Sequence, residues 1–212
     1  MNVLENSIFT RAVFHGDEHR LLLEKVWSKD SKGLGNVAIC MSNAGVMPSI
    51  YHMDYTTLFC CNSLSSLGYN SCSIVNLFSR MTNKLSLSGD LSDLTCSENE
   101  EQILQVSKEC DIFIWAVGSI TTTYKKAIPY QDSIFRLLAP IADKMRIIEN
   151  SIGQQGLHPL HPSLRNKPWK LVPFVLPALT SNDKTDVEAD GNKDTATVKP
   201  KKNDKKSTSL TS

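Results

Sequence analysis

The sequence lacks several patterns that identify common classes of protein. It has no stretch of about 18 apolar residues that could span a bilayer, and residues 1–10 lack the apolar segment of a signal peptide. Its six cysteines include no C-x-x-C pair, which argues against a structural zinc site or an iron–sulfur cluster. We therefore expect a cytoplasmic protein with reduced cysteines, no metal, no cofactor and no membrane partner.

Two catalytic signatures are also missing, and the charge is nearly balanced. The G-x-S-x-G turn of serine hydrolases and the G-x-x-x-x-G-K-[ST] loop of P-loop proteins do not occur, which disfavours both classes. With 23 basic and 22 acidic side chains the net charge is +1. Any contact with an anionic partner must therefore come from local patches.

Enough hydrophobic residues are present for one folded domain. The 212 residues are 41% hydrophobic and 21% charged, which is typical of a globular protein. We expect one α/β domain over residues 1–178 and a disordered tail over 179–212, because the tail has almost no large apolar side chain. Its basic end, residues 199–206, either contacts phosphates without sequence preference or only aids solubility.

Short apolar runs alternate with helical patterns. The runs predict strands at residues 21–27, 37–41, 73–77, 111–115 and 144–148, the first of them at an edge, and helices at 54–67, 97–109 and 133–138. Leu58, Leu64 and Leu67 should form the inner face of the first helix, and Ser97 should cap the second. This order favours a three-layer α/β/α sandwich with a central, mainly parallel sheet of four to five strands.

Polar residues stand where the apolar runs end. Asn43 follows one run, Asn76 ends the next, and a His-Pro segment containing His161 follows the last. In open α/β sheets, ligands bind outside the carboxyl ends of the strands. We therefore expect these three residues to line one cleft.

Each of the two asparagines suits a role in binding. The Asn43 amide oxygen can orient a water molecule, and small residues such as Gly45 let a ligand approach the turn; the alternative is an ordinary Asn-rich turn. Asn76 should be buried, where an amide needs partners. Its donor and acceptor match the edge of a nucleobase; the alternative is a structural asparagine that bridges two loops.

The remaining candidates carry acid–base or anion chemistry. His161, between Leu160 and Pro162, can donate a hydrogen bond to a leaving group or act as acid or base. His158 lies three residues earlier without an H-E-x-x-H pattern, so the pair is weak evidence for zinc. Asp54 either activates water or only caps a helix. Ser163 and Arg165 could take a phosphate.

The motifs resemble those of a bacterial family catalogued as domain of unknown function 1643. The matching positions are Trp27, Met41-Ser42-Asn43, Asp54-Tyr55-Thr56, Val75-Asn76-Leu77-Phe78, Glu98-Asn99-Glu100, Trp115 through Gly118, and His158 through Pro162. They occur in the family's order and cover residues 20–174. Ala44 stands where the family has proline, and Ser163 stands where it usually has Leu-Tyr.

A more distant resemblance is to the uracil-DNA glycosylase superfamily. It implies a glycosylase-like fold in which Asn43 positions water, Asn76 reads a flipped base and His161 stabilises the departing base. Phe78 or Tyr51 would stack on the base near Gly45. The positions that would contact DNA phosphates are Ser163, Arg165, Arg80, Lys84 and Ser119.

These resemblances imply a function that the residues alone do not define. The expected activity is hydrolysis of the N-glycosidic bond of a modified or unusual base in DNA, such as phage DNA, which leaves an abasic site and suits antiviral defence. The protein would act on DNA as a monomer. Two alternatives are a non-catalytic module that binds a nucleotide or base, and a hydrolase of free nucleosides or nucleotide sugars.

Overall fold

A computed structural model describes residues 2–3, 5–29, 33–47, 49–86, 89–165 and 167–177. Its strands are β1 (Phe9–His15), β2 (His19–Val26), β3 (Asn36–Asn43), β4 (Ser71–Phe78), β5 (Ile112–Trp115), β6 (Met145–Glu149) and β7 (Lys170–Pro173). Its α-helices are α1 (Tyr55–Ser66), α2 (Ser97–Glu109), α3 (Ile120–Thr123) and α4 (Ile128–Leu138). The 3-10 helices are η1 (Leu91–Leu94), η2 (Lys125–Ala127), η3 (Ala139–Lys144) and η4 (Pro162–Leu164). The tail predicted at 179–212 lies outside the described residues.

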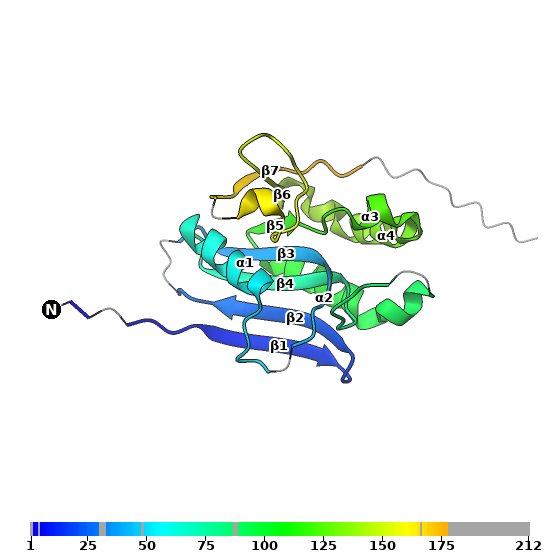
Figure 1. Ribbon diagram of the computed structural model, residues 1–212, viewed down its shortest axis with the longest axis horizontal. Coiled ribbons are helices and arrows are strands. Elements are labelled where there is room, and N and C mark those ends of the chain that lie inside the picture. Colours follow the sequence, from blue (N-terminus) through cyan, green and yellow to red (C-terminus); the bar gives the residue numbers. More distant parts are fainter. Residues whose placement is uncertain are drawn as a thin grey trace, which may run out of the picture. The chain divides into compact units, whose positions relative to one another are not determined.

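The strands form one mixed sheet in the order β1-β2-β4-β3-β5-β6-β7 (Figure 1). The four central strands, β4, β3, β5 and β6, are parallel. On one side β2 pairs antiparallel with β4 and β1 pairs antiparallel with β2, and on the other side β7 pairs antiparallel with β6. The α/β class is confirmed, but the predicted number of four to five strands is too low.

The additional strands lie at the two edges of the sheet, where sequence patterns are weak. β1 has no buried residue along its length, and β7 has four residues and ends at Pro173, a residue that edge strands tolerate. Because β1 pairs outside β2, the run predicted as an edge strand at residues 21–27 is an interior strand.

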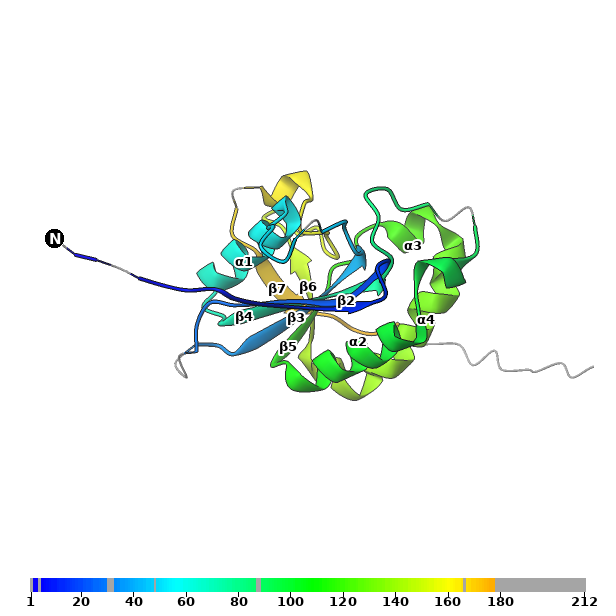
Figure 2. The same cartoon turned by 90° about the horizontal axis from the view of Figure 1, so that it is seen from below.

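Both faces of the sheet are covered by helices (Figure 2). Successive side chains of a strand point to opposite faces. On β3, Ala38 and Cys40 pack in the cluster that includes α2 and α4, whereas Ile39 packs in the cluster that includes α1. A strand buried on both faces has a nearly continuous apolar sequence, which is why this run was recognisable.

The helices follow the predicted pattern with three local differences. Asp54 caps α1, but the inner face of α1 is built from Thr57, Cys60, Cys61 and Leu64, whereas Leu58 is exposed. The cap position of α2 is Cys96, without a side-chain bond, so Ser97 is the first residue of the helix. The helix predicted at 133–138 begins earlier, at Ile128, with Pro129 in its first turn.

The order of connections creates a crevice between β3 and β5. The chain leaves β3 through α1 and returns at β4 on one side, whereas β5, on the other side of β3, is followed by α3 and α4 and then β6. The loops that follow β3 and β5 therefore diverge. Such a switch point at the carboxyl ends of parallel strands is where open α/β sheets bind ligands. Among the described residues no helix has the length and apolar character needed to cross a membrane.

Candidate functional site

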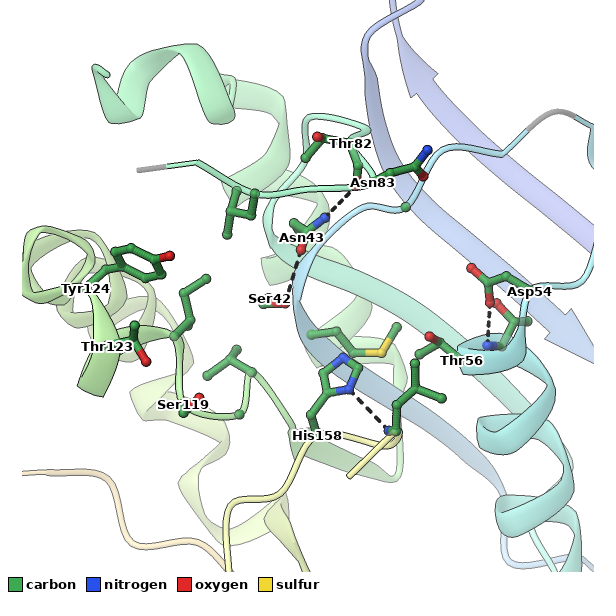
Figure 3. Close-up of a pocket in the computed structure, with 18 of the residues that line it drawn as sticks. Ser42, Asn43, Asp54, Thr56, Thr82, Asn83, Ser119, Thr123, Tyr124 and His158 are labelled. Carbon is green, nitrogen blue, oxygen red and sulfur yellow. Dashed lines mark hydrogen bonds between the residues drawn. The ribbon is translucent and has the colours of Figure 1, made fainter. Parts of the chain in front are cut away.

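A cavity of about 520 Å³ opens at this switch point (Figure 3). Its size is within the range of sites for small molecules. The segments that line it follow β3 and β5, begin α1, and include the loops around residues 82–85 and 158–160. Its polar lining residues are Arg20, Ser42, Asn43, Asp54, Thr56, Thr57, Thr82, Asn83, Ser119, Thr123, Tyr124 and His158.

The amide of Asn43 is held in one orientation. Its Nδ2 donates to the backbone carbonyls of Ala44 (3.2 Å) and Thr82 (3.0 Å), and the flipped amide would place Oδ1 against both acceptors. Oδ1 accepts a hydrogen bond from the Ser42 hydroxyl at 3.3 Å and points toward that side of the cavity (Figure 3). An amide oxygen with a remaining lone pair can hold a water molecule in a defined position.

Asp54 contributes a carboxylate at the start of α1. One oxygen, Oδ1, accepts from the backbone N–H of Thr57 at 2.7 Å and so caps the helix. The other oxygen, Oδ2, lies on the side of Gly45, where an added Cβ would be 3.6 Å from it. One oxygen of the carboxylate therefore caps the helix, and the second is left for contacts with a ligand in the cavity.

His158 is fixed as a hydrogen-bond donor. Its Nδ1 accepts from the backbone N–H of Leu160 at 3.2 Å, so the proton of the neutral ring is on Nε2. Burial lowers the pKa of His158 below its ordinary value, which favours the neutral ring. The imidazole projects from its loop toward the end of β3, and Nε2 has no partner among the described residues (Figure 3). This arrangement can donate to an atom of a bound ligand.

Arg20 is a lining residue that sequence reasoning missed. It is the second residue of β2, directly before an apolar run, and it is only 3% exposed. Nη1 makes two long contacts, to the carbonyl of Gly45 (3.4 Å) and to Sδ of Met47 (3.9 Å), and Nε has no partner. Burial lowers the pKa of the guanidinium, and the charge of Asp54 opposes that shift. A charged residue directly before Leu21-Leu22-Leu23 was the available signal.

The cavity brings together four of the residues predicted for the site, namely Asn43, Gly45, Asp54 and Ser119. Asn76 is not on its lining. Its side chain is 1% exposed, and neither Nδ2 nor Oδ1 has a hydrogen-bond partner. Asn76 lies opposite the lining residue Met41 in the β3–β4 pairing, so both side chains point to the same face of the sheet.

His161 does not line the cavity either, so the expected cleft of Asn43, Asn76 and His161 is not formed. Its Nδ1 is 2.8 Å from the Ser163 hydroxyl and also accepts from the backbone N–H of Ser163, which caps η4. The Ser163 hydroxyl in turn accepts from Nδ2 of the buried Asn150 at 2.8 Å. His161 is thus bonded through Nδ1 to Ser163, and Ser163 to Asn150, whereas the histidine that lines the cavity is His158.

The predicted stacking residues are placed elsewhere. Phe78 is fully buried and stacks on Tyr130 at 5.7 Å between ring centroids, so it offers no face to a ligand. Tyr51 is 93% exposed and is not part of the lining. The aromatic ring at the cavity is that of Tyr124 (Figure 3).

The predicted phosphate contacts differ in their surroundings. Arg80 forms an ion pair with the Glu18 carboxylate at 3.2 Å, which neutralises its charge, and it also donates to the carbonyl of Asp93. Lys84 is exposed and lies between the lining residues Asn83 and Leu85. Arg165 is exposed after η4 and does not line the cavity. Among the described residues no group of three histidine, cysteine or acidic side chains is arranged to hold a metal ion.

Comparison with known proteins agrees with one of the two resemblances. Neither the curated proteins nor the solved structures gave a match. A family model described as "Protein of unknown function (DUF1643)" matches residues 20–160. That span contains β2 from its second residue, the strands from β3 to β6, and every residue that lines the cavity. On this match the chain belongs to the DUF1643 family.

Proposed function

We propose that this protein hydrolyses the N-glycosidic bond of a modified or unusual base in DNA and leaves an abasic site. The observation that carries the proposal is the cavity at the switch point. It combines the Nε2 donor of His158, the oriented amide oxygen of Asn43 and the carboxylate of Asp54. These are a donor for a leaving group, an acceptor for water and a negative charge, which together suit cleavage of a bond between a sugar and a base.

The donor side of the reaction belongs to His158. When an N-glycosidic bond breaks, negative charge develops on the base and positive charge on the sugar. A donor that is already oriented stabilises the developing anion without reorganisation, and loss of one such donor typically lowers the rate by about 10²–10³. His158 meets this condition because Leu160 fixes its tautomer. It replaces His161 in the role that the superfamily resemblance implied.

The water side belongs to Asn43 and Asp54. The Asn43 oxygen would hold the attacking water, and the second oxygen of Asp54 would accept its proton or stabilise the cationic sugar. Both residues line the same cavity as His158 but come from different segments, so a substrate would lie between them (Figure 3).

The finer resemblance to uracil-DNA glycosylases is supported by the order of the motifs. The motifs of Asn43, Asn76 and Trp115 lie on β3, β4 and β5, and that of His158 lies in the loop after β6. These four strands are the parallel strands of the sheet and follow one another along the chain. Because Asn76 is buried and off the lining, reading of the base by Asn76 would need a neighbouring side chain to move, and the flexible Met41 lies opposite it on β3 and lines the cavity. The two unpartnered amide atoms of Asn76 favour such a role.

DNA as the substrate is supported by exposed lysines beside the cavity. Lys84 lies between two lining residues, and Lys125 and Lys126 directly follow the lining residue Tyr124. None of the three forms an ion pair within the described ranges. Cations placed there would provide the local attraction for phosphates that a net charge of +1 does not.

The test is abasic-site formation on a panel of DNAs, from plain and uracil-containing duplexes to phage genomes with modified bases. We expect alkali-labile strand breaks with one substrate, reduced at least tenfold in His158→Ala and retained in the matched control His161→Ala. Circular dichroism of both variants would show that each is folded. Activity that persists in His158→Ala and disappears in His161→Ala would contradict the assignment of the donor.

A second candidate is a module that binds a base or nucleotide without cleaving it. It is favoured by one observation, the position of Asn76 and His161 away from the lining of the cavity. It predicts saturable binding of nucleotides and no product on any DNA. A hydrolase of free nucleosides or nucleotide sugars would instead release free base or sugar without DNA, at rates that depend little on salt.

A further inference from the structure

We propose that Arg20 binds an oxyanion of the ligand, a carboxylate or a phosphate, inside the cavity. The inference deepens the proposed function, on which it rests for the view that the ligand is a base or nucleotide. No motif predicted this site, and Arg20 is not among the residues that the superfamily resemblance identified.

Arg20 carries a permanent charge that is buried. Arg20 is 3% exposed and lines the cavity, and a guanidinium stays protonated in proteins. Removing such a charge from water is costly unless an opposite charge or several hydrogen bonds replace the lost solvation. The surroundings of Arg20 should therefore contain that compensation.

The described part of the protein supplies little of it. The contacts of Nη1, at 3.4 Å to the Gly45 carbonyl and 3.9 Å to the Met47 sulfur, are long and involve no negative charge. Nε has no partner. Within the described ranges no carboxylate oxygen lies within 4.0 Å of the guanidinium, although the charge of Asp54 is near enough to influence it.

The chemistry of the guanidinium indicates which kind of ligand would complete this site. A guanidinium presents several N–H donors in a planar fork, which matches the paired oxygens of carboxylates and phosphates. The amino end of α1 adds a partial positive charge on the same cavity, because Thr56 and Thr57 of its first turn line the wall. The Asp54 carboxylate already caps this helix end through the N–H of Thr57, so the case for an anionic ligand rests on the buried guanidinium of Arg20.

Asp54 sets the strength of this binding. Its charge acts on Arg20 from the cavity wall, so it partly neutralises the guanidinium and repels an incoming anion. Removal of that charge should strengthen the binding of an oxyanion. Asparagine is the suitable replacement because it caps a helix about as well as aspartate does.

The experiment is calorimetric titration of the whole protein with two matched pairs of ligands. The first pair is deoxycytidine and its 5′-monophosphate, which tests a phosphate, and the second is deoxycytidine and its 5-carboxyl derivative, which tests a carboxylate on the base. We expect the anionic member of one pair to bind about tenfold or more tightly than the neutral member. The pair that shows the preference identifies which oxyanion Arg20 receives.

Two variants decide whether Arg20 is responsible. Arg20→Gln should abolish the preference for the anionic ligand, whereas Asp54→Asn should increase it. Arg20→Lys, which keeps the charge but loses the fork, should retain part of the preference and serves if Arg20→Gln does not fold. Equal binding of both members by the wild type, or a preference that survives in Arg20→Gln, would overturn the inference. Because the readout is binding, an absence of abasic sites alongside a clear preference would remove the glycosylase assignment and leave the oxyanion site standing.

Discussion

Gly118 and His158 lie so close that a side chain at position 118 would disturb the site. A Cβ on Gly118 would be 3.1 Å from the Cβ of His158, and the backbone of Gly118 has φ +66. The glycine after β5 therefore allows the close approach that places the imidazole at the cavity wall.

We predict that Gly118→Ala lowers both stability and function. The positive φ alone costs about 1–2 kcal/mol in the free energy of unfolding, and the contact displaces His158 and its donor. Gly156→Ala is the matched control, because Gly156 has φ +70 and nothing within 4 Å of an added Cβ. Denaturant unfolding should show a similar loss in both variants, whereas only Gly118→Ala should reduce abasic-site formation. An equal loss of activity in both would mean that the contact with His158 has no role.

The two oxygens of Asp54 allow its structural and chemical roles to be separated. Asp54→Ala removes the cap of α1 and should lower the free energy of unfolding by about 1 kcal/mol, whereas Asp54→Asn should stay close to the wild type. If the carboxylate acts on water, turnover should fall by about 10² or more in both variants. Full activity in Asp54→Asn would show that the residue only caps the helix.

Asn76 and Asn99 provide a comparison between an amide with no hydrogen bond and an amide that is bonded through its Nδ2 but not its Oδ1. Nδ2 of Asn99 donates to the carbonyls of Asn76 (3.0 Å) and Leu77 (3.3 Å), whereas no hydrogen bond reaches the amide of Asn76. We predict that Asn76→Leu leaves the free energy of unfolding unchanged or raises it by about 1–3 kcal/mol, and that Asn99→Leu lowers it by about 1 kcal/mol or more. Urea unfolding of the two variants measures the difference.

The same pair tests the role of Asn76 in the proposed reaction. A base-reading amide that is kept at a cost to stability should be needed for activity, so Asn76→Leu should form at least about tenfold fewer abasic sites. A destabilised Asn76→Leu with normal activity would show that the amide has a structural partner in solution, such as a buried water.

The central elements of the fold were predictable because their sequences are strongly patterned. β3 is buried on both faces and reads as a continuous apolar run, and Asp54 gives α1 a clear start. The edge strands β1 and β7 have no such pattern, because solvent on one side removes the need for apolar residues. Because β1 was not predicted, β2 was expected at an edge, where a charge near the start of a strand would be solvated. The burial of Arg20 was therefore not predicted either.

The candidate site was predictable in its location but not in all of its residues. Asn43 and Asp54 follow from the rule that ligands bind at the ends of parallel strands. The choice between His158 and His161 does not follow from it, because both precede proline in one loop. The choice depends on where each ring lies, because both rings are held through Nδ1, by Leu160 in His158 and by Ser163 in His161, but only His158 lines the cavity.

The lowered pKa of His158 predicts a pH dependence of stability. Burial favours the neutral ring, so the folded state binds a proton less readily than the unfolded state, whose histidine has the ordinary value of 6.5. As the pH falls through 6.5, the unfolded state takes up a proton that the folded state does not, and the stability due to His158 decreases. The decrease ends once the pH is below the folded pKa as well.

We therefore expect the difference in unfolding free energy between the wild type and His158→Gln to be constant above about pH 7.5 and to shift against the wild type toward pH 5. Subtraction of the variant removes contributions that both proteins share, including that of His19, whose pKa is also lowered by burial. A difference that does not change between pH 8 and pH 5 would mean that His158 is as well solvated in the folded protein as in the unfolded chain, and that its ring is not enclosed by the cavity wall.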